Sequence, residues 1–359
     1  MNTFADRLKI RLPLIQAPMA GAQGSAMALA VGAAGGLGSL PCAMLAPDAL
    51  RAELEKLRAS GRPYNVNFFC HQPPALDAAR DAAWRAALKP YYDELGLDMA
   101  TIPSGPGRLP FSAEAADLLE EFKPAVVSFH FGLPAPELLA RVKAWGAFVL
   151  SSATTVRESL WVQEHGADAV IAQGLEAGGH RGHFLSMDLS EQMGTFALLP
   201  QLVKVLRVPV IAAGGIADAA GVRAAMALGA AGVQVGTAYL CSDEALTSPL
   251  HRAALQSEAA RHTALTNLFT GRPARGIVNR LMRELGNADA EHFSTGLGAV
   301  APAFPLATNA IGPLRAAAEQ AGRTDFTPLW SGQNASGCRT GSATEITQTL
   351  AQGLEGAPA

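Results

Sequence analysis

A repeated pattern of short apolar segments and helical segments is the feature of this sequence that most constrains its fold. Apolar runs that are nearly continuous, rather than alternating with polar residues, are typical of parallel strands buried on both faces. Helical patterns separate most of the runs. The runs lie at residues 13–21, 36–43, 64–69, 125–132, 148–153, 169–174, 208–215 and 232–239. This eightfold strand–helix alternation predicts an α/β fold, a (β/α)8 TIM barrel, with a doubly wound parallel sheet as the alternative.

The spacing of the runs is uneven in two places. Residues 70–124 separate the third run from the fourth, and we expect an elaborated loop with helices there. After the eighth run, residues 243–285 look helical, and this tail is too large for one βα unit. We therefore predict three parts: a barrel at 1–240, a smaller, mostly helical substrate domain that caps it at 241–325, and a C-terminal segment at 326–359 that returns to the barrel.

Charge and cysteine content exclude several classes of protein. Lys and Arg total 28 against 31 Asp and Glu, for a net charge of −3, and there is no basic run, so a nucleic-acid partner is not expected. Hydrophobic residues make up 49% of the chain, enough for a large core. The four cysteines are scattered without a CxxC motif, which argues against a disulfide scaffold or a structural zinc site and fits a reducing cytoplasm.

A segment without charged residues, between Arg11 and Asp48, raises the alternative of a secretory signal or a membrane span. Three prolines (Pro13, Pro18 and Pro41) and several glycines interrupt it, so it contains no clean apolar helix of membrane-spanning length. We expect two buried strands around a helix of small residues, and no membrane association.

The strongest candidate for catalysis is the loop after the sixth run, Gln173-Gly-Leu-Glu-Ala-Gly-Gly-His-Arg-Gly182. Adjacent glycines, Gly178 and Gly179, let the backbone approach a ligand closely and display His180 at the strand end. Imidazole is suited to act as a base near neutral pH. The alternative is a glycine-rich turn with an exposed histidine. His180 and His183 also form an HxxH pattern, but no carboxylate partner is apparent and we predict no metal site.

The loops after the seventh and eighth runs carry Gly214-Gly215 and Gly236-Thr237. In (β/α)8 barrels these two loops frequently form a phosphate site, and glycine amides with a threonine hydroxyl can satisfy phosphate oxygens without a lysine. The alternative is ordinary turn chemistry. A phosphate here would belong to a phosphorylated substrate or to a cofactor such as FMN.

Three further positions stand near the ends of predicted strands. Pro18, with small neighbours, would let the backbone lie flat against a planar ring. Asn67 would offer its amide to ring heteroatoms, or is a satisfied buried side chain. His130 would line the pocket wall with Met19 and Phe68, or act directly. The sequence contains no GxGxxG, P-loop or GxSxG motif, so the signatures of Rossmann dinucleotide binding, nucleotide hydrolysis and α/β-hydrolase chemistry are absent.

Taken together, these motifs resemble the nitronate monooxygenase family, formerly called 2-nitropropane dioxygenases, and its class I members in particular. The resemblance runs through PLIQAPMAG, NVNFF, SFHFG, QGLEAGGHRGHF, VPVIAAGGIADAAGVRAAMALGAAGVQVGTAYL and LWSGQ. It departs from the family at Phe293 and Phe304, where tyrosines are usual in the stretch that shapes the substrate pocket. The segment AGGHRG alone is also similar to flavin-dependent enoyl-ACP reductases.

The resemblance implies an FMN-dependent enzyme that oxidises alkyl nitronates such as propionate 3-nitronate, and in some members neutral nitroalkanes, with O2 to a carbonyl compound and nitrite. It implies that His180 is the catalytic base. We expect Phe68 and His130 to line the substrate pocket. The implied FMN contacts are Ala17, Pro18, Met19, Asn67, Gln173, Gly178, Gly179, Gly214, Gly215, Gln234, Val235, Gly236, Thr237 and Gln333.

The expected setting is a cytoplasmic detoxification enzyme, a monomer or homodimer, that acts on small molecules. Two alternatives stay open at this point. One is an FMN-dependent NAD(P)H reductase of an enoyl thioester or a quinone. The other is a phosphate-binding barrel without redox activity, such as a sensor or a lyase.

Overall fold

The structure is a computed structural model that describes residues 3–105, 107–286 and 300–355. Eight parallel strands form its central sheet in the order β1-β9-β8-β6-β5-β4-β3-β2. A parallel bridge between Ile15 and Leu37 joins the two ends of this order, which closes the sheet into a TIM barrel. The strands are β1 (Leu14–Gln16), β2 (Ser39–Pro41), β3 (Asn65–Phe69), β4 (Val126–His130), β5 (Phe148–Ala153), β6 (Ala169–Gln173), β8 (Val210–Ala213) and β9 (Gly232–Val235). Each lies within one of the eight predicted runs, and the predicted fold class is confirmed.

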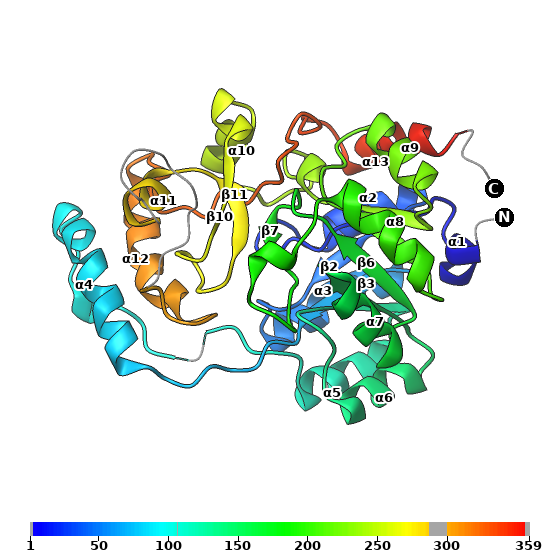
Figure 1. Cartoon of the computed structure of the whole chain (residues 1–359), viewed down its shortest axis with the longest axis horizontal. Helices are drawn as coiled ribbons and strands as arrows, with labels where there is room; N and C mark the ends of the chain where they lie inside the picture. The colour runs from blue at the N-terminus through cyan, green and yellow to red at the C-terminus, as the bar shows by residue number, and fades with distance from the viewer. Residues whose placement is uncertain (1–2, 106, 287–299, 356–359) are drawn as a thin grey trace.

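Helices surround this barrel (Figure 1). They are α2 (Ser25–Ala34), α3 (Pro47–Ala59), α5 (Ala113–Phe122), α6 (Pro136–Ala144), α7 (Val156–Glu164), α8 (Thr195–Val205), α9 (Ala219–Ala227) and α13 (Ala343–Ala351). The helix after the eighth strand comes from the far end of the chain, because α13 packs between α2 and α9. It begins with a capping box, in which Ser342 and Glu345 satisfy each other's backbone N–H groups.

The strands are buried because both of their faces are covered. One set of side chains fills the barrel interior, where Ile15, Leu150, Ile171 and Ile211 pack together and Phe4 of α1 (Thr3–Leu8) joins them. The other set packs against the helices. Close packing fixes some small residues: a Cβ on Gly38 would lie 2.1 Å from the carbonyl oxygen of Ala28 in α2.

A second group of elements packs beside the barrel, on the left in Figure 1. It contains α4 (Ala78–Glu94), α10 (Pro249–Leu255), α11 (Arg280–Leu285), α12 (Ala307–Gln320), and a three-stranded sheet of β10 (Thr263–Thr266), β11 (Ala274–Ile277) and β7 (Gly179–His180). Short 3₁₀ helices complete the chain at Met99–Thr101, Leu189–Glu191, Thr237–Tyr239, Glu258–Arg261 and Gln352–Leu354.

In this second group one sequence expectation is corrected, and one helix from outside the predicted substrate domain joins it. Residues 243–285 were expected to be helical, but β10 and β11 interrupt them, because β11 pairs with the strand β7 that carries His180. The helix α4 precedes β4 in the chain, outside the predicted substrate domain at 241–325, yet Trp84 and Tyr92 of α4 share an apolar cluster with α11 and α12. The Tyr92 hydroxyl donates to the carbonyl oxygen of Ala310 at 2.6 Å. The predicted domain boundaries themselves stay a prediction.

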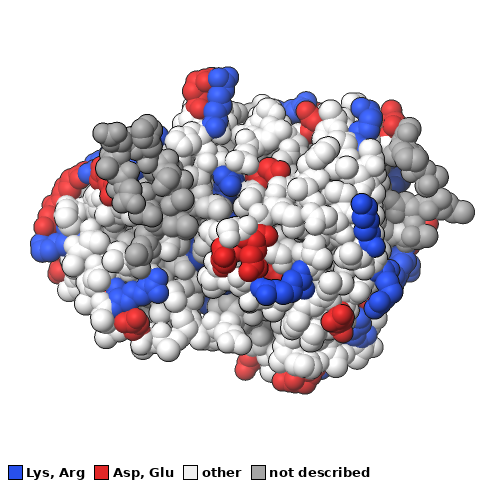
Figure 2. Space-filling view, viewed as in Figure 1, with Lys and Arg blue, Asp and Glu red and all other residues white. Residues whose placement is uncertain are grey.

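The surface charge and the character of the helices are both as the composition leads us to expect. Figure 2 shows acidic and basic side chains interspersed over wide uncharged areas of one face. The described basic side chains on that face do not gather into a stripe of the kind that tracks nucleic acid. None of the described helices combines the length and apolar character needed to cross a membrane.

Candidate active site

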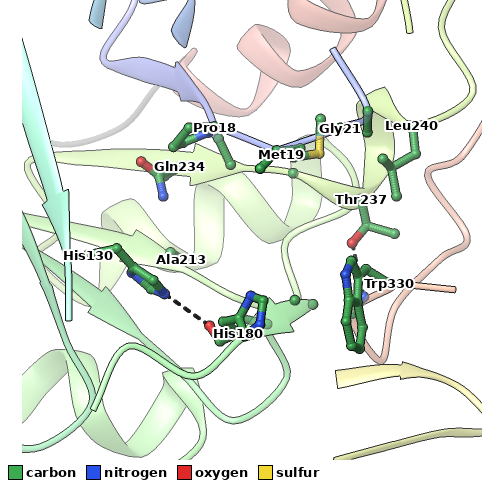
Figure 3. Close-up of a pocket in the computed structure, with 18 of the residues that line it drawn as sticks. Pro18, Met19, Gly21, His130, His180, Ala213, Gln234, Thr237, Leu240 and Trp330 are labelled. Carbon is green, nitrogen blue, oxygen red and sulfur yellow. Dashed lines mark hydrogen bonds between the residues drawn. The ribbon is translucent and has the colours of Figure 1, made fainter. Parts of the chain in front are cut away.

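The described residues enclose a cavity of about 320 Å³ at the carboxyl ends of the barrel strands. This volume lies in the range of small-molecule sites. The loop after β1 forms one wall with Pro18 and Met19, and His180 and Trp330 lie across the cavity from it (Figure 3). Most residues predicted for the site line this cavity: Ala17, Pro18, Met19, Asn67, His130, Gln173, Gly178, Gly179, His180, Gly214, Gly215, Gln234, Gly236 and Thr237.

Strand alternation explains the placement of two other predicted residues. Phe68 points toward the helices and contacts Phe111, with ring centroids 4.9 Å apart, while its neighbour Phe69 lines the cavity. Val235 is likewise packed in the barrel–helix core, and the preceding Gln234 faces the cavity. Successive side chains of a strand point to opposite faces, so only one of each pair can reach the site.

Gln333 takes part in the site through its backbone rather than its side chain. Its side chain is exposed, and its N–H donates to the carbonyl oxygen of Glu176 at 2.9 Å. The neighbouring Gly332 and Asn334 line the cavity instead. Phe293 lies outside the described residues.

The backbone of His180 is held from two directions. Its residue pairs with Ala274 across β7 and β11. Its carbonyl oxygen accepts from Gln173 Nε2 at 3.0 Å and from His130 Nε2 at 3.1 Å. Gln173 also accepts from the N–H of Gly182 at 2.7 Å, so both ends of its amide clamp this loop.

His130 is a neutral positioning residue in this arrangement. A carbonyl oxygen can only accept, so Nε2 of His130 carries the proton that it donates to His180. Nδ1 then accepts from the Ser152 hydroxyl at 2.5 Å. Burial lowers the pKa of His130 to about 3, which is consistent with a neutral ring.

The ring of His180 lies among aromatic side chains. Phe304 and Trp330 have ring centroids 5.3 and 5.6 Å from it. Nε2 of His180 lies 2.9 Å from the Thr270 hydroxyl oxygen, and that hydroxyl donates to the carbonyl oxygen of Arg272 at 3.3 Å. Thr270 oxygen therefore accepts from Nε2, which leaves Nδ1 as the nitrogen with a free lone pair.

The charge state of His180 follows from its surroundings. Burial lowers its pKa well below the ordinary value, and the cations of Arg108 and Arg272 lower it further. The imidazole is therefore neutral near pH 7. A neutral, oriented imidazole in a cavity can accept a proton from a ligand.

Arg181 holds the loop that carries His180 in place. It was not predicted as a site residue. It is fully buried, and its guanidinium donates to the carbonyl oxygens of Gln173 and Gly174 at 2.9 and 2.7 Å and to Gln192 Oε1 at 2.7 Å. Burial lowers its pKa to about 9. The sequence signal that could have identified Arg181 was a charged residue directly after the GGH motif, because a buried arginine needs several acceptors.

The loops after β8 and β9 present unused backbone donors. Gly214 and Gly215 have φ angles of 118° and 73°, which residues with a Cβ rarely adopt. Within the described ranges, no acceptor pairs with the N–H groups of Gly215, Gly236 and Thr237. The Thr237 hydroxyl oxygen accepts from the N–H of Gly332 at 3.0 Å, so its own proton is available to a ligand. These donors suit an anion such as a phosphate.

Gln234 gives the cavity an unused acceptor. Its Oε1 is buried and has no hydrogen-bond partner in the part of the chain that the structure describes. Buried polar groups are normally paired, so this atom indicates a ligand with an N–H donor. The described residues hold no cluster of three or more His, Cys, Asp or Glu side chains suited to a metal ion.

The site contains three more residues that were not predicted. Trp330 and Arg108 line the cavity, and Thr270 holds the ring of His180. Trp330 belongs to the LWSGQ segment, which the resemblance had marked only through Gln333. Thr270 and Arg108 carry no local sequence signal, since each lies in a loop of the second group of elements.

Comparison with known proteins gives a consistent result. The family model "Nitronate monooxygenase" matches residues 2–353. A nitronate monooxygenase of Paraburkholderia phytofirmans is 42% identical, covering 97% of this chain and 93% of the relative. One of Pseudomonas aeruginosa is 40% identical, covering 99% of each. The solved nitroalkane oxidase of Streptomyces ansochromogenes superposes with a TM-score of 0.86 at 36% identity, covering 99% of this chain and 98% of that one.

Proposed function

Because the chain belongs to the nitronate monooxygenase family, we propose that it oxidises alkyl nitronates, such as propionate 3-nitronate, with O2 to a carbonyl compound and nitrite. Membership makes the protein an oxidoreductase that acts on nitronates or nitroalkanes, in a family that is flavin-dependent. The observation that carries the proposal is a neutral histidine with a free ring nitrogen, set in an aromatic cavity beside unused anion donors.

FMN is the proposed cofactor, and the described residues fit it. Gly215, Gly236 and Thr237 would hold its phosphate through backbone N–H groups and the threonine hydroxyl. Gln234 Oε1 would accept from the one N–H group of the isoalloxazine ring. Pro18 and Met19 would lie along the ring. When bound, FMN supplies the redox chemistry by which electrons pass from the substrate to O2.

His180 moves a proton when the substrate is a neutral nitroalkane. Its free Nδ1 accepts the proton on the α-carbon, and Thr270 holds the ring through Nε2 while this happens. The α-carbon is left as a nitronate anion. The cations of Arg108 and Arg272, which disfavour a proton on His180, favour that anion.

A substrate supplied as the nitronate does not need this step. In that case His180 has no proton to remove, and its neutral ring serves as part of the cavity wall beside the substrate. Phe69 and Trp330 form apolar walls of the cavity, and Phe304 packs against Phe69 and His180, so bulk water is kept from the reacting groups.

The purified protein tests the proposal directly. We expect a yellow flavin spectrum, O2 uptake with propionate 3-nitronate, and nitrite in step with nitronate consumed. A colourless protein that cannot be reconstituted with FMN would overturn it and favour a non-redox phosphate-binding barrel. Rapid anaerobic bleaching by NADH or NADPH, without nitronate oxidation, would instead favour the reductase.

The cellular setting is also a proposal. All four cysteines are free thiols, as expected in a reducing cytoplasm. We propose a cytoplasmic monomer or homodimer that removes toxic nitronates. Cell fractionation and sedimentation of the purified protein test location and oligomeric state.

A further inference from the structure

Two cysteines that the proposed reaction does not use are neighbours beside the phosphate loops. Cys241 and Cys338 lie far apart in the chain, yet their thiols are hydrogen-bonded. Cys338 also packs on the apolar cluster that contains Cys241. Both are free thiols, and Cys241 is fully buried whereas Cys338 is partly exposed. Two thiols in contact, one of them open to solvent, have the arrangement needed for reversible oxidation to a disulfide.

One of the two cysteines lies on a strap, residues 331–338, that leads from the second group of elements back to α13 of the barrel (Figure 1). The N–H of Gly332 donates to the Thr237 hydroxyl oxygen at 3.0 Å. Asn334 Nδ2 donates to the carbonyl oxygen of Gly215 at 3.2 Å. Gly332 and Asn334 both line the cavity. The strap therefore crosses both loops that present anion donors and closes the cavity at that end.

A few separate contacts hold the strap in place. The S–H of Cys338 donates to the carbonyl oxygen of Thr237 at 2.9 Å. A Cβ on Gly337 would lie 2.1 Å from the carbonyl oxygen of Ala217, so the strap packs on the loop after β8. Side chains on its outer face, such as Gln333, are exposed. Surface segments held by few hydrogen bonds open at a much lower free energy than the core, so the strap is the part of this site that can lift.

The other cysteine lies on a fixed backbone. Arg252 of α10 donates to the carbonyl oxygen of Cys241 at 2.7 Å. It also donates to the carbonyl oxygens of Ser242 and Ala245 at 2.7 and 2.8 Å. Cys241 lies just beyond the 3₁₀ helix Thr237–Tyr239, which carries the hydroxyl donor of the anion site. A bond from Cys241 would therefore tie the strap to a rigid part of the barrel.

The surroundings of the pair favour a thiolate. The hydrogen bond with Cys338 and the positive charge of Arg252 lower the pKa of Cys241 to about 7, against the opposing effect of burial. The thiolate is the reactive form of cysteine, so the pair reacts with an oxidant near neutral pH. Desolvation instead raises the pKa of Cys70, the other partly exposed cysteine, well above its ordinary value. That thiol stays protonated and lacks this reactivity.

We propose that Cys241 and Cys338 form a redox modification site, at which a hydroperoxide such as H2O2 makes a reversible disulfide that fastens the strap over the phosphate end of the cavity. In a reducing cytoplasm a disulfide of this kind is transient and acts as a sensor. The disulfide itself does not depend on the proposed function. Its expected effect, slower exchange of FMN, rests on that function.

The reaction is a two-electron oxidation. The proton passes between the two adjacent sulfurs, so the partly exposed sulfur of Cys338 reacts as the thiolate. It attacks one oxygen of H2O2, the O–O bond breaks, and the departing hydroxide takes up a proton and leaves as water. The sulfur of Cys241 then displaces the hydroxyl group from Cys338: the S–S bond forms, the S–O bond breaks, and the Cys241 proton leaves with the hydroxide as a second water. The two thiols lose two electrons, and the peroxide is reduced to two waters.

Peptide mapping tests the modification site. After brief treatment of the purified protein with H2O2, we expect the peptides containing Cys241 and Cys338 to be linked, with two thiols fewer, and a dithiol to reverse the change. Cys338→Ser keeps a donor to Thr237 and abolishes the link. Cys70→Ser, which removes the other partly exposed thiol, is the matched control and leaves the link unchanged. A treated protein without the link, or one in which Cys70 pairs as readily, overturns the proposal.

Hydrogen exchange tests the strap and separates this inference from the proposed function. We expect the amides of residues 332–338 to exchange about tenfold more slowly in the oxidised protein, and not in peroxide-treated Cys338→Ser. FMN release, followed by flavin fluorescence after dilution, should slow by a similar factor. A link that leaves exchange in the strap unchanged overturns the fastening role. A protected strap in a protein that neither contains nor takes up flavin overturns the proposed function alone.

Discussion

Replacing His180 by asparagine separates proton removal from the rest of the reaction. The substitution removes the imidazole but leaves the anchors of the backbone, since Gln173 and His130 both hold the carbonyl oxygen of residue 180. The side chain loses one hydrogen bond, to Thr270. We therefore expect His180→Asn to fold and to bind flavin like the unaltered protein.

The expected magnitude depends on whether the substrate still carries its α-proton. A positioned general base contributes roughly 10²- to 10⁴-fold, or about 3–5 kcal/mol of transition-state stabilisation. His180→Asn should lose this factor in kcat/KM with neutral nitroethane. With ethyl nitronate, which is already deprotonated, no proton has to be removed and only the packing of the imidazole is lost, so we expect less than about a tenfold decrease.

The assay measures O2 uptake near neutral pH. Each substrate is freshly prepared, so that nitroethane has not ionised. The matched control is His165→Asn, an exposed histidine stacked on Trp161 outside the cavity, which should retain full activity. An equal loss with both substrates would show that His180 acts by orientation. Full activity of His180→Asn on nitroethane would refute its role as the base.

The pH dependence of the unaltered enzyme gives an independent check. The pKa of His180 lies well below its ordinary value, so the base form persists as the pH falls through 6.5. We expect kcat/KM for nitroethane to stay level across neutral pH and to decline only in clearly acidic solution. A decline centred near the ordinary histidine pKa would contradict the buried, cation-flanked environment derived from the structure.

Three further substitutions test the hydrogen bond to His180, a buried carboxylate and the packing of the barrel on its helices. Thr270→Val removes the acceptor that holds Nε2 of His180, and kcat/KM for nitroethane should fall roughly 5- to 20-fold while the value for ethyl nitronate stays within about twofold. Glu158→Gln should lower the free energy of unfolding by about 2–4 kcal/mol, measured by urea denaturation, because the buried carboxylate accepts from the N–H groups of residues 154, 184 and 185. Gly38→Ala should prevent accumulation of folded protein, assayed by circular dichroism, because its Cβ would lie 2.1 Å from the Ala28 carbonyl oxygen.

The barrel and its glycine loops were predictable because their signals are local. A strand buried on both faces needs a continuous apolar run, and a turn with positive φ needs a glycine, so both are written in neighbouring residues. The eight strands accordingly lie within the predicted runs, and the glycines with positive φ at 179, 214 and 215 line the cavity.

The sequence predictions were wrong where the outcome depended on which face of a strand a side chain occupies, or on which distant strand a segment pairs with. Phe68 and Phe69 are chemically identical in the sequence, and only the register of β3 decides which one faces the cavity. Residues 263–266 and 274–277 form strands because β7 provides an edge for β11, a partner far away in the chain. A local pattern does not contain that information.

The sequence by itself determined the barrel, the position of His180 at a strand end and the glycine loops that suit a phosphate, because short-range periodicity and turn chemistry specify them. The tertiary structure decided which nitrogen of His180 is free, through Thr270, and that the ring is neutral, through burial and the cations of Arg108 and Arg272. These properties depend on residues that lie about 70 to 90 positions from His180 along the chain and only meet when the second group of elements packs on the barrel. Desolvation and charge proximity act through space, so no segment of the sequence could show them alone.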